Sequence, residues 1–480
     1  MIRAILSRYN PFVYAKALAY MAQATEYQPG ALAEWYSRTG DFSTVMDRKE
    51  LVPTRAAGVF RLFVGFVQVW VALCGIAGIV LHPGGVFGVV VGALIVVLSP
   101  FVTVLLLLLL LVLSRQFVLK PKEKRALHEA GQIFNSHKAT IIAVAGSYGK
   151  TTMKELLLTV LREGKKVAAT PANMNVATSH AKFARGLKGD EDVVIIEFGE
   201  GRPGDVARFT QMAGADIAVI TGLAPAHLDA YKTVDAAAED IMSLAAALPP
   251  DKVYMNIESP LLVSHLKHGY KQYSVEGCGD VTITNIGLEV TKTEFTLQFT
   301  GGQPAAAVTG LLGRHNMGPL AAAADIARLL GLNEQQILAG LAKTMPFEHR
   351  MQPRQLPSGA WIIDDTYNGT IEGMKAGLQL LAALPATRTW YVTPGLVEQG
   401  KEKIAVHREL GRAIGSANPN FVVLMKNSAA NYILDGIREV MFTGDVRIEA
   451  NPQAFYQGLD HVLAAGDIAM LQNDWSDNYN

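Results

Sequence analysis

The chain has 480 residues, of which 43 are basic and 43 acidic, so its formal net charge is +0. Balanced charge gives no general reason to expect nucleic-acid binding, and this length predicts two or three domains. A hydrophobic fraction of 50% and a mean hydropathy of +0.21 are too apolar for a wholly soluble enzyme. The two cysteines, Cys74 and Cys278, are too few for a disulfide framework, and the sequence has no cysteine–histidine cluster typical of zinc.

Residues 1–56 are mixed in character and are expected to form an N-terminal cytoplasmic segment. Ala15–Ala24 predicts a short amphipathic helix, whereas Asn10-Pro11 would interrupt the apolar core of a signal peptide. The segment fits a membrane surface or packing on another subunit, and the sequence does not choose between them.

Two long apolar runs follow. Leu62–Leu81 is interrupted only by Gln68, and after the turn His82–Gly85 a second run covers Val86–Leu113. Each run is long enough to cross a bilayer, which takes about 20 residues, and Pro100 predicts a kink in the second. Buried helices of a soluble core are the alternative, but two adjacent runs favour a transmembrane helical hairpin over residues 57–117.

Basic residues flank this predicted hairpin at both ends: Arg48, Lys49, Arg55 and Arg61 before it, and Arg115, Lys120, Lys122, Lys124 and Arg125 after it. Positive residues stay on the cytoplasmic side. We therefore expect a two-span protein of the inner (cytoplasmic) membrane with its catalytic domains in the cytoplasm.

From residue 140 onward, short β-branched runs alternate with alanine-rich helical stretches, which indicates α/β sheets. The predicted strands are Ile141–Ala145, Val193–Phe198, Ile217–Thr221, Val253–Asn256, a hairpin in Val281–Thr300, Trp361–Asp364, Trp390–Thr393, Phe421–Met425 and Ile468–Leu471. Helices are predicted at Ala321–Leu330 and Glu334–Leu341. A new strand–helix series begins near Glu348, so we expect a central domain over 118–347 and a C-terminal domain over 348–480.

A nucleotide-binding loop is predicted at Ala145–Thr152, between a strand and the start of a helix. Backbone N–H groups and the helix dipole would face a phosphate, with Lys150 at the terminal phosphates and the Thr151 hydroxyl suited to Mg²⁺. Val144 stands where the general P-loop has its first glycine, so the loop must be a variant. The alternative is an ordinary glycine turn, which the Gly-Lys-Thr-Thr ending disfavours.

Further polar residues follow predicted strands. Glu197 ends one strand and His227 comes shortly after the next, so both are expected at the ligand edge of a parallel sheet, where a carboxylate suits Mg²⁺. Arg350 lies at the domain boundary and could reach a γ-phosphate on closure. Asp364-Asp365 ends the first C-terminal strand and could hold a ribose or a metal, or cap a helix.

Together these motifs resemble the Mur ligase family, the ATP-dependent amide-forming ligases of peptidoglycan precursor synthesis. The resembling blocks are AGSYGKTT (145–152), TPANMN (170–175), IIEFGEGRPGD (195–205), ITGLAPAHLD (220–229), GRHN (313–316), EHRM (348–351) and IIDDTYN (362–368). They cover roughly residues 139–480 in order, the span of two family domains. The resemblance implies a central P-loop ATPase domain followed by a Rossmann-like α/β domain.

The resemblance also implies roles around ATP and Mg²⁺. The loop that wraps the phosphates comprises Gly146, Ser147, Tyr148, Gly149, Lys150, Thr151 and Thr152. Thr151, Glu197 and His227 would lie around magnesium. Lys150 and Arg350 would neutralise the reacting phosphates, so Lys150, Glu197, His227 and Arg350 are the expected catalytic set.

Other roles concern the nucleoside and the acceptor. The resemblance implies that His315 and Asn316 flank the adenine, that Asp365 binds the ribose, and that Asn173 and Asn175 lie near the acceptor, a nucleotide-sugar peptide in family members.

Three positions depart from the family pattern. The offset of a family lysine falls on Ile241, so either Glu239 or Asp240 supplies the missing carboxylate or the second metal is held differently. Pro319 replaces an asparagine expected near adenine, and Thr393–Gly400 lacks the usual Gly-Asp-Met of the acceptor-side loop. The predicted hairpin stands where cytosolic members carry a UDP-binding domain.

The sequence therefore predicts a membrane ligase that activates a carboxylate as an acyl phosphate and joins it to an amino acid or dipeptide. The acceptor would be a UDP-linked or lipid-linked cell-wall peptide. A poly-γ-glutamate-type polymerising ligase and a non-catalytic ATP-binding scaffold are the alternatives. Amine donor, homo-oligomeric state and the role of residues 1–56 stay open.

Overall fold

The structure is a computed structural model of the whole chain. It describes residues 2–25, 27–43, 45, 55–81, 85–171, 174–224, 231–367, 369–396, 399, 402–427 and 429–473. The chain divides into two compact units, Met1–Lys124 and Arg125–Asn480. The finer division predicted from the sequence, with boundaries after residues 56, 117 and 347, stays a prediction.

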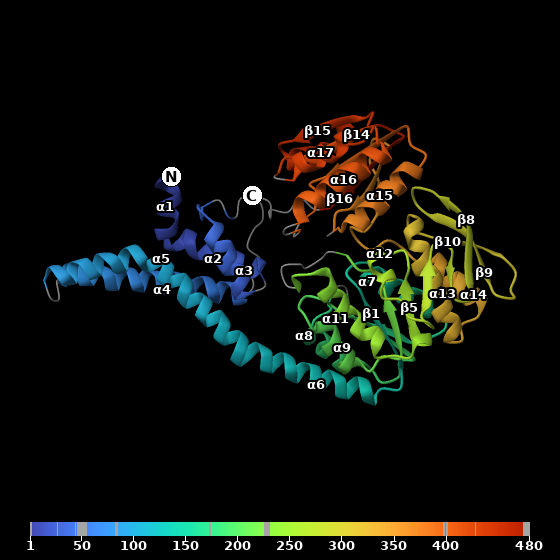
Figure 1. Ribbon diagram of the computed structural model, residues 1–480, viewed down its shortest axis with the longest axis horizontal. Coiled ribbons are helices and arrows are strands. Elements are labelled where there is room, and N and C mark those ends of the chain that lie inside the picture. The colour runs from blue at the N-terminus through green and yellow to red at the C-terminus, as the bar shows by residue number, and fades with distance from the viewer. Residues whose placement is uncertain are drawn as a thin grey trace. The chain divides into compact units, whose positions relative to one another are not determined.

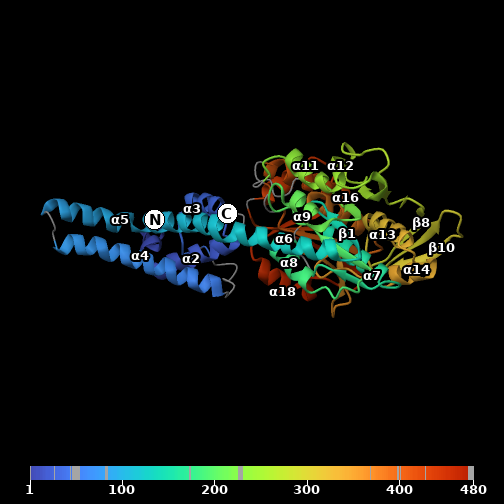
Figure 2. The ribbon, with the colours of Figure 1, turned by 90° about the horizontal axis from the view of Figure 1, so that it is seen from below.

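The first unit is helical. Its elements are α1 (Ile2–Tyr9), α2 (Pro11–Ala24), α3 (Pro29–Arg38), α4 (Arg55–Leu81) and α5 (Val86–Ser114), and α5 continues through a π-helical turn (Arg115–Leu119) into α6 (Lys120–Ser136). Helices α4 and α5 run side by side as a hairpin (Figures 1 and 2). Both are long and apolar enough to cross a membrane, which by itself is weak evidence that they do.

Hydrogen bonds between side chains and backbone carbonyls join the short helices to the hairpin. The Tyr14 hydroxyl donates to the Pro100 carbonyl at 2.7 Å, and Gln68 Nε2 donates to the Arg8 carbonyl at 2.6 Å. Pro100 has no N–H for the carbonyl of Val96, and the Ser99 hydroxyl donates to that oxygen at 2.8 Å. The proline is therefore accommodated inside α5 without leaving this carbonyl unsatisfied.

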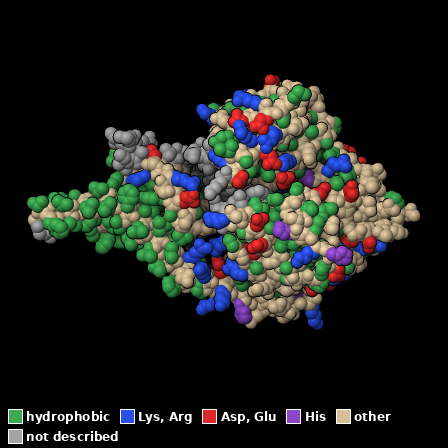
Figure 3. Space-filling view, viewed as in Figure 1, with side chains coloured by type: hydrophobic (Ala, Val, Ile, Leu, Met, Phe, Trp, Pro, Cys, Tyr) green, Lys and Arg blue, Asp and Glu red, His purple; other side chains and the backbone are tan. Residues whose placement is uncertain are grey.

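The hairpin carries its small residues inside and its large apolar residues outside. A Cβ atom at Gly92 would lie only 2.6 Å from the Gly75 carbonyl oxygen, so only glycines allow this approach of the two helices. Phe66 and Trp70 on α4, by contrast, are 69% and 59% exposed. Figure 3 shows hydrophobic side chains gathered along this unit. This pattern is the reverse of a helix buried in a soluble core.

The second unit contains a ten-stranded sheet in the order β10-β9-β8-β7-β6-β5-β4-β1-β3-β2. The strands are β1 (Thr140–Ala145), β2 (Val167–Ala169), β3 (Val193–Glu197), β4 (Ile217–Ile220), β5 (Val253–Asn256), β6 (Lys271–Ser274), β7 (Gly277–Cys278), β8 (Val281–Leu288), β9 (Thr293–Phe299) and β10 (Ala305–Thr309). Pairing is parallel from β2 to β6 and antiparallel from β6 to β10. The carboxyl ends of β1, β3 and β4 consequently meet at one edge.

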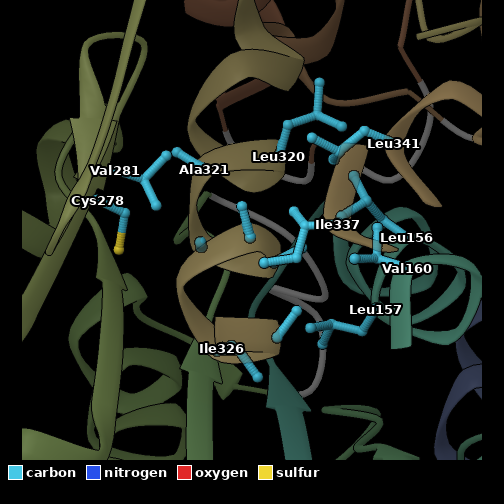
Figure 4. Packing of buried hydrophobic residues seen from close by; sticks show 14 of the residues in the cluster. Leu156, Leu157, Val160, Cys278, Val281, Leu320, Ala321, Ile326, Ile337 and Leu341 are labelled. Atoms are coloured by element: carbon cyan, nitrogen blue, oxygen red, sulfur yellow. The ribbon is translucent and has the colours of Figure 1, made fainter. Parts of the chain in front are cut away.

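The sequence of β1 is apolar from Ile141 to Ala145 because the strand is buried on both faces. Ile142 and Val144 point into one core, and Ile141 and Ala143 point into the other, so the strand is buried on both faces. The helices that cover the sheet are α6, α7 (Lys150–Leu161), α8 (Ala177–Arg185), α9 (Asp205–Ala213), α11 (Val234–Ala246), α12 (Pro260–Val263), α13 (Met317–Leu329) and α14 (Glu334–Ala342). Figure 4 shows α7, α13 and α14 meeting through Leu156, Leu320 and Ile337.

A six-stranded sheet follows, in the order β11-β12-β16-β13-β14-β15. Its strands are β11 (Gln352–Gln355), β12 (Trp361–Asp365), β13 (Arg388–Thr393), β14 (Phe421–Met425), β15 (Asp445–Glu449) and β16 (Asp467–Gln472), all parallel except β11. Its helices are α15 (Ile371–Ala383), α16 (Lys403–Ala417), α17 (Ala430–Arg438), α18 (Pro452–Gln457) and α19 (Leu459–Val462). The predicted α/β class is confirmed by both sheets.

Candidate functional site

The predicted nucleotide-binding loop joins β1 to α7. Gly146 has a φ of +144°, where a side chain would collide with the Thr221 hydroxyl and the Gly222 backbone. Gly149, the residue before α7, has a φ of +74°. Both glycines are therefore required by the backbone, and the loop leads into the N-terminus of α7, where helix N–H groups favour an anion.

The loop is anchored to the strand beside it. Ser147 N donates to the Gly222 carbonyl at 2.8 Å, and the Thr221 hydroxyl donates to the carbonyls of Ala145 and Tyr148. The loop is thus fixed to the carboxyl end of β4, although Val144 replaces the first glycine of the general motif.

Lys150 begins α7 and turns its ammonium group back over the loop. Its Nζ donates to the Gly146 carbonyl at 2.6 Å and lies 2.7 Å from Glu200 Oε2. The ammonium group thus lies against the loop that leads into the N-terminus of α7, where a phosphate is expected to bind.

Glu197 is the last residue of β3, the strand that pairs with β1. Because β1 and β3 are parallel with Val144 opposite Glu197, the register places this carboxylate beside the loop. The Thr151 hydroxyl donates to Glu197 at 3.0 and 3.1 Å, and Asn175 Nδ2 donates to it at 3.2 Å. Glu197 is only 1% exposed, so these polar neighbours stabilise a buried carboxylate.

Other groups bind the backbone of Glu197 or lie close to its carboxylate. Its N–H donates to the Thr170 hydroxyl at 3.1 Å, and His180 Nε2 donates to its carbonyl at 3.0 Å. Burial lowers the pKa of His180 to about 4, so this ring is neutral at physiological pH. Lys154 Nζ, fully buried, lies 3.5 Å from Glu197 Oε2.

Arg350 is held in a strained turn between the two sheets. Its neighbours His349 and Met351 both have positive φ angles, +58° and +46°, which non-glycine residues rarely adopt. The guanidinium lies 4.4 Å from the centroid of the Tyr367 ring. Burial lowers the pKa of Arg350, while the nearby charges of Asp365, Tyr367 and Glu197 oppose that shift.

Asp365 ends β12 close to this turn. It accepts hydrogen bonds from Gln472 Nε2 at 2.7 Å and from Met351 N at 3.3 Å. Burial raises the pKa of Asp365 to about 6, so its carboxyl group is largely ionised only above that pH. A ribose hydroxyl would then have a charged acceptor.

His315 and Asn316 lie in a 3₁₀ turn (Arg314–Asn316) that leads into α13. Asn316 is buried and donates to the Leu312 carbonyl at 2.7 Å, whereas His315 is exposed. The amide of Asn316 thus fixes the turn, and its Nδ2 also lies 3.1 Å from His315 Nε2.

Two predicted residues, His227 and Asn173, lie outside the described residues. Within the part of the chain that the structure describes, no group of three or more His, Cys, Asp or Glu side chains could hold a metal. Asp240 is one of the two residues expected to supply the carboxylate that is missing at Ile241. It accepts hydrogen bonds from the N–H groups of Gly204 and Ala207 at 3.0 and 3.1 Å and so caps α9.

The sequence reasoning assigned no role to Glu200, Lys154 or His180. Lys154 stands one helical turn after Lys150 on α7, so both lysines lie on one face of the helix. This spacing could have indicated that Lys154 belongs to the site. Glu200 and His180 carry no comparable signal, because their places depend on how loops and α8 pack against β3.

Comparison with known proteins agrees with this geometry. Residues 144–327 match the family model described as Mur ligase middle domain, which contains the loop, Glu197 and the turn at His315. Residues 144–327 of this chain are therefore similar to the middle domain of Mur ligases. The stretch outside this match contains Arg350 and Asp365, whose roles remain proposals.

Similar proteins align with part of this chain at about 30% identity. A UDP-N-acetylmuramoyl-tripeptide–D-alanyl-D-alanine ligase of Mycobacterium bovis is 30% identical over 284 residues, 57% of this chain and 56% of the relative. The alignment thus spans little more than half of that relative. The enzyme of the same name from Escherichia coli is 29% identical over 63% of this chain and 68% of its own length.

Solved structures show the same fold. MurF from Acinetobacter baumannii has a TM-score of 0.64 at 20% identity, covering 73% of this chain and 77% of its own. MurF from Thermotoga maritima, solved in complex with ADP, has a TM-score of 0.64 at 22% identity, covering 73% and 80%.

Proposed function

We propose that this protein is an ATP-dependent ligase that forms an amide bond through an acyl phosphate, in the synthesis of peptidoglycan precursors. The observation that carries the proposal is the joint placement of Lys150, Thr151 and Glu197 beside a loop whose glycines require positive φ. A phosphate-binding loop next to a buried carboxylate and a hydroxyl is what a magnesium-bound triphosphate needs.

The residues present fit a magnesium ion. Thr151 and Glu197 offer hard oxygen ligands 3.0 Å apart, and His227 is the further ligand implied by the family resemblance. Bound there, magnesium would neutralise phosphate charge as the reaction proceeds.

The chain's own residues would then supply charge and alignment. An oxygen of the acceptor carboxylate attacks the γ-phosphorus of ATP, and ADP leaves. The amine next attacks the acyl carbon, phosphate leaves, and the amine loses a proton. Lys150 and Arg350 would stabilise the charge that develops on the transferred phosphoryl group. The Arg350 guanidinium lies 4.4 Å from the centroid of the Tyr367 ring, a contact that would orient it before substrate arrives.

Roles are proposed for the remaining residues by family resemblance. His315 and Asn316 would flank adenine, Asp365 would bind the ribose, and Asn173 and Asn175 would lie near the acceptor. Asn175 already donates to Glu197, so it could connect the acceptor side to the metal side.

The names of the relatives support D-alanyl-D-alanine as the amine donor and a UDP-linked muramoyl peptide as the acceptor. They also favour addition of one dipeptide over polymerisation of a single amino acid. The test is ligation by the detergent-solubilised full chain, with ATP, amino acids and dipeptides offered to a UDP-linked and a polyprenyl-linked acceptor. We expect one dipeptide added to the UDP-linked peptide. ADP release without product from any pair would instead favour a non-ligating ATP-binding scaffold.

Membrane anchoring is a second part of the proposal. It rests on the glycine-packed interior and exposed apolar exterior of α4 and α5, with basic residues beyond both ends. We expect the chain to stay in the membrane fraction after washing with alkaline carbonate, and both hairpin ends to face the cytoplasm. Release of the intact chain by the carbonate wash would contradict the two spans.

A further inference from the structure

The phosphate-facing lysine is already paired with an acid. Lys150 Nζ lies 2.8 Å from Glu200 Oε1 and 2.7 Å from Glu200 Oε2, so both oxygens of one carboxylate face its ammonium group. The two side chains are 11% and 4% exposed. Screening by water is weak at such burial, so the attraction is stronger than in a surface pair.

Glu200 comes from a different element than the loop it pairs with. It lies between β3 and α9, three residues after Glu197, so two buried carboxylates flank the loop. Glu197 is satisfied by Thr151 and Asn175, whereas Glu200 faces Lys150. The two acids therefore have different partners.

The Lys150 ammonium group cannot pair fully with Glu200 and with a nucleotide phosphate at the same time. An ammonium group has three donors, and one of them already binds the Gly146 carbonyl. A phosphate entering the loop would compete with Glu200 for the others. It would also meet the negative charge of a buried carboxylate, which adds repulsion.

We propose that Glu200 is an internal counter-ion that occupies Lys150 in the empty site and is displaced by the nucleotide phosphates. It thereby sets the nucleotide affinity of this chain below the value that the loop alone would give. This inference rests on the proposed function, because it takes Lys150 as a phosphate ligand.

The test is the affinity of the detergent-solubilised full chain for Mg·ADP and for a non-hydrolysable Mg·ATP analogue, measured by calorimetry. Glu200→Gln keeps the size of the side chain and removes its charge. We expect it to bind at least about tenfold more tightly than wild type, because a charge-assisted pair is no longer broken. Without nucleotide, the variant should unfold at a lower temperature, and ADP should raise that temperature more than in wild type.

The matched control is Glu163→Gln. Glu163 also binds a lysine with both oxygens, at 2.8 Å from Lys343 Nζ, but it lies beyond the C-terminal end of α7, whereas the loop precedes the N-terminal end. Its loss should leave nucleotide affinity unchanged. Glu200→Asp, which keeps the charge but withdraws it from Lys150, should fall between wild type and Glu200→Gln, and it replaces that variant if Glu200→Gln does not fold.

The outcomes separate the two proposals. Unchanged or weaker nucleotide binding by both Glu200 variants would overturn the counter-ion role, and weaker binding with a raised magnesium requirement would make Glu200 a metal ligand instead. Absence of Mg·ADP binding by folded wild-type protein would refute the proposed function itself.

Discussion

Replacing Lys150 with alanine is expected to lower kcat/KM for ATP-dependent ligation by about 10³-fold or more, since a phosphate loop without its lysine leaves developing charge uncompensated. The structure gives the reason. The Lys150 ammonium group lies over the loop, 2.6 Å from the Gly146 carbonyl, where the terminal phosphates would be bound. Both ADP release and formation of the ligated product should fall together, measured with the detergent-solubilised full chain.

Lys166→Ala is the control for this variant. Lys166 is in the same α/β unit but its side chain is 69% exposed and pairs with Asp190 at the surface. Its removal should leave turnover unchanged. Substantial ligation by folded Lys150→Ala protein would refute the assignment of Lys150.

Replacing Glu197 with glutamine is expected to lower kcat by about 10²- to 10³-fold and to raise the magnesium concentration needed for half-maximal rate. The substitution keeps the shape of the side chain but removes the charge that a metal would balance. The Thr151 hydroxyl and Asn175 amide would still have an oxygen to bind. A magnesium titration of the initial rate measures both effects.

The fold of this variant must be checked, because Lys154 is fully buried and lies 3.5 Å from the carboxylate that is neutralised. Glu155, 3.2 Å from the same ammonium group, remains to balance it. Glu294→Gln, at an exposed position of β9, is the charge-matched control. Unaltered magnesium dependence in folded Glu197→Gln would contradict a metal role for Glu197.

The strands that build this site can be predicted from local sequence because both of their faces are buried. The strand before the loop is apolar from Ile141 to Ala145 because both faces of β1 are covered, and this continuous apolar run shows it directly. The runs Val193–Ile196 in β3 and Val422–Met425 in β14 are likewise apolar and buried. Glycines at Gly146 and Gly149 mark a turn that no other residue could form.

Short or half-exposed strands give weaker signals. β2 has three residues, β7 has two, and β15 is exposed at four of its five positions, so none shows a clear period-two pattern. The packing of α1–α3 against the hairpin was also not predicted. It depends on long-range contacts such as Tyr14 with Pro100, which are 86 residues apart.

Partners within the site are the hardest to predict. Lys150, Thr151 and Glu197 follow from motif and strand position, but the pairing of Lys150 with Glu200 depends on how the loop after β3 folds back over the phosphate loop. Likewise, Asp240 adjoins Ile241, the position where the family lysine is expected, yet its carboxylate caps α9. Spacing along the chain does not determine which acid faces which base.

The most direct test of the account is an experimental structure of the full chain with Mg·ADP. The account predicts ADP phosphates within hydrogen-bonding distance of the Gly146–Thr152 backbone and of Lys150 Nζ, magnesium ligated by Thr151 or Glu197, and Glu200 moved away from Lys150. Nucleotide bound elsewhere, with Lys150 and Glu197 directed away from its phosphates, would contradict it.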